Sequence, residues 1–511
     1  MPCLKRAMRG APYALLCLLS AAAPPAASTS ALPPGDPALL QAQLSQAISR
    51  GSPFLAIAPA LYNFSGASLI ISNAASLTVD LRGSELTFSP ASDAGIRIAN
   101  ASNLTLVGPV IDSAPFFSSQ GVVSAGVRDG KWFNYTFAVE AGFPPPVLGG
   151  RTVFWHAENR TMVHAQVETT TTAMSLAETS PGVYAVATSF FGNPTLTVPL
   201  PCLGSITPVH ADLVTCVNCS AVRYLDWAVY GSAGMAFLEI AGDGGNVYEN
   251  VSVVRRPGTT RLLASSIDVL HSTGMAAGPA LLDSELSAAG DDLFAVHCEL
   301  GILWWRAADA TAYVIDTAGA GTEALRGNVA GAELQFYALN TTMEGLASAT
   351  VRSAVAVTDP ALLAAAAGAQ AHIEQTLHTP IRDFPVSLFR VDFAAPLPPY
   401  LGNFSAMVQN NRRCGAGARV ERSYLHDTTG GMRLKAAGVS VVNSTVRNAY
   451  GMRMLPELFW TQSMSANVSL RNNVLTGCGC APHVPHAIEF LPGEVPGLEL
   501  VNNSVLPPEC F

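Results

Sequence analysis

Short strand-like segments recur along this chain at a nearly constant interval, and this repeat restricts the fold more than any other feature. Near the C-terminus, three segments share one pattern of apolar and polar residues. They are Val439–Val446, Val468–Leu475 and Leu498–Val505. Near the N-terminus, Leu77-Thr-Val79 recurs at a similar interval as Leu104-Thr-Leu106. Strand repeats of about 20 to 30 residues without a helical period indicate a stacked solenoid, in which each rung contacts its neighbours.

An asparagine returns at the same position of the three C-terminal segments, as Asn443, Asn472 and Asn502. Asparagine favours turns, so we expect these side chains to stack rung upon rung. The sequence therefore predicts an all-β fold, a right-handed parallel β-helix of the pectin-lyase-like kind. Leucine-rich repeats are the competing solenoid, but their dense leucine pattern is absent. A β-sandwich of hairpins would not keep such a period.

Two stretches interrupt the repeat, and we interpret both as small β-rich, barrel-like domains inserted at turns. We expect these inserts to border one face of the solenoid. The predicted organisation is a signal peptide over 1–27, N-terminal rungs over 36–126 and a first insert over 127–222. Rungs over 223–305, a second insert over 306–405 and C-terminal rungs over 406–511 follow.

The first residues are typical of a secretory signal peptide. Three basic residues, Lys5, Arg6 and Arg9, precede the apolar run 14–19 and small residues up to Ala27. No later stretch reaches about 18 consecutive apolar residues, so we expect no integral membrane span. Twelve Asn-x-Ser/Thr sequons would face solvent if glycosylated. We therefore predict an exported glycoprotein, secreted or held in a cell wall or endomembrane lumen.

Charge and cysteine content agree with that environment. Only 13% of the residues are charged and the net charge is −9, so the chain has no basic excess to neutralise phosphates and we expect no nucleic-acid partner. Eight of the 10 cysteines lie beyond the signal peptide, including the close pairs Cys216/Cys219 and Cys478/Cys480. In an oxidising compartment we expect disulfides. Zinc is the alternative, but no histidine lies at ligand spacing near Cys216.

Three aspartates fall on what should be adjacent rungs. Asp291 and Asp292 follow Asp268 at a spacing close to one rung. Parallel strands stack about 4.8 Å apart, so these carboxyl groups should project into one groove with His271 and His297. Repulsion between carboxylates keeps one protonated and another ionised, and glycosidic cleavage needs that pair. The alternative is that the aspartates cap turns or bind calcium.

The run from Asp268 to His297 also resembles a known family. Its Asp-x-x-His, Gly-Pro and Gly-Asp-Asp-x-x-x-Val-His elements look like glycoside hydrolase family 110, as do residues 224–231 and 425–435 more loosely. The resemblance implies an exo-acting α-1,3-galactosidase on a β-helix with barrel inserts, without metal or cofactor. It implies Asp268 as general acid, and Asp291 and Asp292 as the groups that activate water with inversion. The chain departs from the family at Gly430-Gly431, where an arginine is expected, and at 461–463, where the family tends to place an acid.

We expect a carbohydrate substrate to be held by six further side chains. They are His271, His297, Arg433, Lys435, Glu457 and Trp460. The polygalacturonases, glycoside hydrolase family 28, are the nearest rival, since Arg433-Leu-Lys435 imitates their Arg-x-Lys. They carry a Gly-His-Gly that does not follow Asp292 here, and a negatively charged protein attracts a polyanion poorly. A non-catalytic β-helix that binds glycans or builds an extracellular coat is the alternative outside the enzymes.

Overall fold

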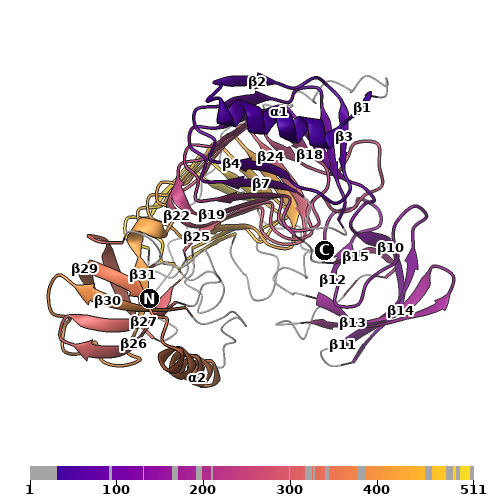
Figure 1. Ribbon diagram of the computed structural model, residues 1–511. Coiled ribbons are helices and arrows are strands. Elements are labelled where there is room, and N and C mark those ends of the chain that lie inside the picture. Colours follow the sequence, from indigo (N-terminus) through magenta and orange to yellow (C-terminus); the bar gives the residue numbers. More distant parts are fainter. Residues whose placement is uncertain are drawn as a thin grey trace, which may run out of the picture.

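The computed structural model describes most of the chain between residues 32 and 506. The described residues are 32–90, 95–129, 132–163, 171–190, 198, 200–208, 211–298, 300–316, 325, 329–339, 344–377, 387–454, 463–478, 487–490 and 495–506. They form a parallel β-helix that carries two closed β-barrels (Figure 1). The predicted fold class is confirmed.

Three parallel sheets, here called A, B and C, run the length of the solenoid. Sheet A consists of β1 (Pro34–Gly35), β3 (Leu61–Phe64), β6 (Glu85–Phe88), β9 (Val110–Ser113), β18 (Ala228–Val229), β21 (Ser252–Val253), β24 (Glu285–Ala289), β33 (Tyr424–Thr428), β36 (Thr445–Arg447), β39 (Val474–Thr476) and β42 (Ser504–Leu506). Sheet B consists of β2 (Phe54–Ala56), β5 (Thr78–Asp80), β8 (Thr105–Val107), β17 (Arg223–Leu225), β20 (Val247–Glu249), β23 (Ala280–Leu282), β32 (Arg419–Glu421), β35 (Ser440–Val442), β38 (Ser469–Arg471) and β41 (Glu499–Val501). Sheet C consists of β4 (Leu69–Ser72), β7 (Ile96–Ala99), β16 (Val214–Val217), β19 (Phe237–Gly244), β22 (Leu270–Ala277), β25 (Phe294–His297), β34 (Met432–Leu434), β37 (Met452–Arg453) and β40 (Ile488–Glu489).

The chain visits the sheets in a fixed cycle, from C to B to A and back to C in the next rung. Side chains alternate between the interior and the outside, as the strand period of two requires. In β7, for example, Ile96 and Ile98 are buried in the solenoid core, whereas Arg97 faces outward. The apolar rows from successive rungs merge into one continuous core.

Asparagines at the B-to-A turns stack as predicted. Asn443, Asn472 and Asn502 all have positive φ, between 51° and 55°, a conformation that asparagine tolerates better than most residues. The amide of Asn472 donates to Asn443 Oδ1 over 3.2 Å. The repeated asparagine thus marks a left-handed turn residue that each of these rungs needs.

Helix α1 (Pro37–Ser49) covers the N-terminal end of the solenoid core (Figure 1). Asp36 caps it by accepting the Ala38 N–H over 2.8 Å, and Pro37 begins the helix, a position where its missing N–H is not needed. The buried face, Leu40, Leu44 and Ala47, closes the apolar column that the first rung would otherwise expose.

The first barrel, barrel 1, is inserted at an A-to-C turn, between β9 and β16. Its strands are β10 (Ser119–Asp129), β11 (Trp132–Val139), β12 (Arg151–Trp155), β13 (Thr171–Ser180), β14 (Val183–Phe190) and β15 (Cys202–Thr207). The insert thus spans 119–207 rather than the predicted 127–222. Residues 214–217 already pair with 96–99 as a rung of sheet C, and their short apolar alternation does not distinguish a rung from a barrel strand.

The second barrel, barrel 2, is inserted at a C-to-B turn, between β25 and β32. Its strands are β26 (Gly301–Ala308), β27 (Thr311–Asp316), β28 (Glu333–Ala338), β29 (Gly345–Ala356), β30 (Ser387–Phe393) and β31 (Ala406–Asn410). Helix α2 (Pro360–Leu377) packs on β30, and the 3-10 helix η2 (Asn411–Arg413) follows β31. The barrel spans 301–410 rather than the predicted 306–405. Because one barrel precedes a sheet C strand and the other follows one, the two barrels flank the outer face of sheet C (Figure 1).

One disulfide confirms the expectation of disulfide bonding, but the close pair Cys216/Cys219 is not bonded. A disulfide joins Cys298 and Cys414, which lie just before and just after barrel 2 and so close its base. Cys216 and Cys219 are free thiols buried in the solenoid core, and Cys478 is also free and buried. Cys480 lies outside the described residues. In the part of the chain that is described, no helix is long and apolar enough to cross a membrane.

Candidate functional site

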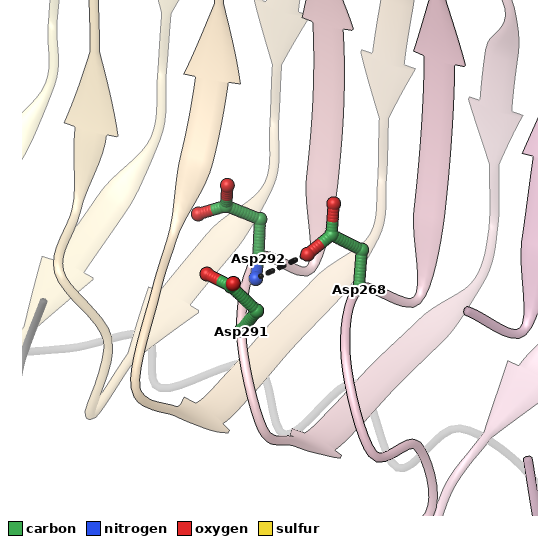
Figure 2. A group of neighbouring side chains, drawn as sticks. All are labelled: Asp268, Asp291 and Asp292. Atoms are coloured by element: carbon green, nitrogen blue, oxygen red, sulfur yellow. Dashed lines mark hydrogen bonds between the residues drawn. The ribbon is translucent and has the colours of Figure 1, made fainter. Parts of the chain in front are cut away.

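Asp268, Asp291 and Asp292 meet at one corner of the solenoid, as the spacing predicted. All three precede strands of sheet C: Asp268 enters β22, and the pair Asp291-Asp292 enters β25 of the next rung. One oxygen from each carboxyl group lies within 4.8 Å of the others. Figure 2 shows the side chains on two adjacent loops, with the Asp292 N–H donating to Asp268 Oδ1 over 3.1 Å. Rung stacking alone brings these groups together.

The floor beside the aspartates is the outer face of sheet C. One row of outward side chains follows the strand register from rung to rung, and His271, Ala295, Arg433 and Arg453 are consecutive members of it. Arg433 Nε contacts Asp292 Oδ2. A pocket next to Asp292 is lined by Gly430, Gly431, Met432, Arg433, Tyr450 and Arg453.

Glycine is required at positions 430 and 431, where the family pattern led us to expect an arginine. A Cβ atom on Gly430 would lie 2.4 Å from Asp292 Oδ1, and one on Gly431 would lie 2.5 Å from the Gly451 carbonyl oxygen. The backbone therefore approaches the carboxyl group closely, and the Gly431 N–H donates to Asp292 Oδ1 over 2.9 Å.

Asp291 is held as an ionised group. Burial pushes its pKa upward, but the guanidinium groups of Arg151 and Arg433 outweigh burial and leave the pKa below its usual value. Arg151 Nη2 lies 2.9 Å from Asp291 Oδ2 and comes from barrel 1, far earlier in the chain. The Asp291 side chain is also the most exposed of the three aspartates, at 27%.

Asp292 has the opposite tendency. Burial, together with the negative charges of Asp291 and Asp268, raises the pKa of Asp292 to about 7, although Arg433 and the Gly431 N–H act against the rise. Two adjacent residues in the chain thus have pKa values shifted in opposite directions. An acid and a base side by side at neutral pH are the requirement for proton transfer to a leaving group and from water.

His271 and His297 extend the site as a hydrogen-bonded chain. His271 Nδ1 lies 2.5 Å from Asp268 Oδ2, and His271 Nε2 lies 2.8 Å from His297 Nε2. His297 is almost fully buried, at 1% exposure. Burial and the positive charges of His271 and Lys435 hold the pKa of His297 well below its usual value, so His297 is neutral. The chain fixes the orientation of Asp268, and the His271 side chain is 11% exposed.

The other predicted substrate-binding residues have different outcomes. Arg433 lies in the site, but Lys435 is completely buried, so its side chain is not presented to a substrate here. Glu457 and Trp460 lie outside the described residues.

Three residues of the site were not predicted from the sequence, namely Arg151, Tyr450 and Arg453. Arg453 follows Arg433 by one rung of sheet C, and the repeat could have revealed it. Nothing in the sequence signals Arg151, because it reaches the site from an insert.

Three carboxylates this close could also hold a hard cation such as Ca²⁺, which prefers oxygen ligands. Two of them already contact guanidinium groups, Asp291 with Arg151 and Asp292 with Arg433. The protein itself thus supplies the positive charge that the cluster needs, and we assign no metal to it.

No family model and no curated protein matches the sequence. Among solved structures the chain is similar to the tailspike protein gp49 from Pseudomonas phage LKA1, with 10% identity, a TM-score of 0.23 and coverage of 86% of this chain and 52% of that one. It is similar to the mannuronan C-5 epimerase AlgE4 A-module of Azotobacter vinelandii, with 10% identity, a TM-score of 0.25 and 93% of both chains covered. It is also similar to the Gp54 tailspike of Acinetobacter baumannii bacteriophage AP22, solved with a capsular saccharide, with 9% identity, a TM-score of 0.17 and coverage of 87% and 56%. The chain thus spans about half the length of the tailspikes, and the geometry of the site carries the functional argument.

Proposed function

We propose that this protein hydrolyses glycosidic bonds at the corner formed by Asp268, Asp291 and Asp292. The observation that carries the proposal is the arrangement of three carboxyl groups within 4.8 Å, two of which have pKa values shifted in opposite directions. Hydrolysis of a glycoside requires one carboxyl group that protonates the leaving oxygen and another that remains ionised.

The pKa directions favour different roles from those that the family resemblance implies. Asp292 is the proton donor, because its pKa of about 7 keeps it partly protonated at neutral pH. Asp291 is the base that activates water. Asp268 adds negative charge next to Asp292 and accepts its backbone N–H, so it keeps the donor protonated and in place.

Inversion at the anomeric carbon is the stereochemical outcome that the family resemblance implies. Arg151 engages one oxygen of Asp291 and keeps the carboxylate ionised, the form that can accept a proton from water. The carboxylate oxygens lie closer together than the about 6.5–9.5 Å typical of inverting enzymes and nearer to the about 5–5.5 Å of retaining ones. For inversion, water would therefore bind beside the cluster rather than between an opposed pair of carboxyl groups. Following the family resemblance, we propose an α-galactoside as the first substrate to test, with cleavage of its terminal sugar. We also propose that the enzyme acts outside the cell.

A hydrolase of acidic sugars, similar to a polygalacturonase, is the second candidate. Arg433 and Arg453 are register neighbours that line the pocket beside Asp292, and two guanidinium groups there suit the carboxylate of a uronic acid. Lys435 does not complete the Arg-x-Lys pattern, because it is buried. Comparing galactosides with galacturonides as substrates separates the two candidates.

The pKa directions predict a bell-shaped dependence of kcat/KM on pH. Activity should rise where Asp291 loses its proton, below the usual aspartate pKa of about 4. It should fall through the pKa of Asp292, about 7, because the donor is then ionised. Rates with a glycoside whose leaving group needs protonation, measured from about pH 3 to about pH 9, check this. A plateau that continues well above neutral pH would contradict the assignment of Asp292 as donor.

A further inference from the structure

Barrel 1 leaves the solenoid at the same kind of turn that carries the aspartates, the A-to-C corner. An apolar cluster that includes Phe116, Trp155 and Leu262 joins the barrel to the loop that precedes Asp268. Arg255 of that loop lies over the Trp155 ring at 4.8 Å and donates to the Arg160 carbonyl oxygen over 2.9 Å. The barrel is therefore packed against the loop that leads into the site.

Arg151 is the first residue of β12 and is held by the barrel itself. Its backbone lies in register between β15, opposite Thr207, and β13, opposite Thr172. Its side chain is only 15% exposed and points out of the barrel to Asp291 Oδ2, 2.9 Å away. A rigid strand thus delivers one guanidinium group to one carboxylate of the site.

Asp291 needs this partner, because its surroundings otherwise oppose ionisation. It sits in a partly buried corner beside Asp292 and Asp268, and like charges at this distance favour the protonated form. The positive groups that face it are Arg151 from barrel 1, Arg433 from β34 and His271 from β22. Arg433 is shared with Asp292, whereas among the described contacts Arg151 makes its side-chain ion pair with Asp291.

We propose that Arg151 is a positioning residue that keeps Asp291 ionised and oriented. Barrel 1 thus contributes a side chain on which the catalytic site depends. That barrel 1 serves catalysis rests on the proposed glycosidase function. The contact between Arg151 and Asp291, and its effect on the ionisation of Asp291, do not.

The activity test uses Arg151→Gln, Arg151→Lys and Arg151→Ala, with Arg223→Gln as control. Arg223 pairs with Glu249 on the exposed face of sheet B, so its loss changes the net charge by the same amount away from the site. In Arg151→Gln the pKa of Asp291 should rise, and the acid limb of kcat/KM should move up by about one pH unit or more. Arg151→Lys should shift it less, and added guanidinium ion should restore part of the activity of Arg151→Ala. A wild-type pH profile in Arg151→Gln would overturn the proposal.

A second measurement needs no substrate. A carboxyl group whose pKa is lowered by folding stabilises the protein above its unfolded pKa, and this stabilisation is lost as pH falls through the folded pKa. Arg151→Gln should therefore lower Tm clearly at neutral pH and much less in acid, at about pH 3. In an Asp291→Asn background the same substitution should have a smaller effect at neutral pH. Equal effects in both backgrounds would overturn the proposal even if the protein hydrolyses glycosides. If no glycoside is hydrolysed, this cycle still decides whether Arg151 holds Asp291.

Discussion

Replacing Asp292 by asparagine should lower kcat by about 10²–10⁴-fold on substrates with a poor leaving group, which is the range that general acid catalysis supplies. Asparagine keeps the size of the side chain and can still accept the Gly431 N–H, so the fold should survive. The proton that Asp292 gives to the departing oxygen is lost. Initial rates and circular dichroism of the purified variant check both halves of this expectation.

Leaving groups identify which aspartate donates the proton. A glycoside of an acidic phenol departs without protonation, so Asp292→Asn should retain much more activity on it than on an alkyl glycoside. Asp283→Asn is the matched control, because Asp283 is an exposed aspartate at the turn between β23 and β24 and pairs with Arg422 away from the site. If Asp268→Asn shows the leaving-group dependence and Asp292→Asn does not, the donor is Asp268, as the family resemblance implies.

Replacing Asp112 by alanine should lower the free energy of unfolding by about 3 kcal/mol, the lower end of the range for breaking a buried ion pair. Asp112 on β9 is 2% exposed and accepts from Arg256 over 2.6 Å and from Arg261 over 2.7 Å. Both arginines lie in the loop before Asp268, and Arg261 also covers the Phe116 ring at 4.3 Å. Without the carboxylate, Arg261 keeps only the carbonyl oxygen of Tyr230 at 3.3 Å among its described hydrogen-bond partners.

Urea denaturation of Asp112→Ala measures this loss. The control is Glu249→Gln, which removes one partner of an exposed ion pair and should cost at most about 1 kcal/mol. Because the loop carries the chain into Asp268, activity should fall together with stability in Asp112→Ala. Equal stability of the two variants would contradict the role of Asp112 as the anchor of this loop.

The solenoid could be predicted from the sequence because its period is local and repeated. Asn443, Asn472 and Asn502 mark the same left-handed turn, and the valines and leucines around them alternate as strands do. The barrel boundaries were less accurate, since a short alternation such as that of residues 214–217 fits a barrel strand as well as a rung. The disulfide joins Cys298 to Cys414 across the whole of barrel 2, and no spacing rule identifies such a pair.

The candidate site was predictable where it depends on the rung repeat, and not where it depends on an insert. Asp291 follows Asp268 at a spacing close to one rung, so stacking places them together. Arg151 reaches the site because barrel 1 packs beside it, and the rung repeat of the sequence gives no information on where an insert packs. The burial of Lys435 was likewise missed, because alternation places it on the outer face of sheet C but does not indicate what covers that face.

The most direct test is to incubate the protein with a panel of α- and β-glycosides, galactosides and galacturonides included, and to follow the anomeric protons by NMR. The carboxyl cluster predicts release of a free sugar from at least one member, and the family resemblance implies that the first-formed anomer has inverted configuration. A first-formed anomer of retained configuration would mean that Asp291 attacks the sugar itself. No release from any member, together with binding of the same protein to a glycan array, would contradict the enzyme account and identify a glycan-binding β-helix.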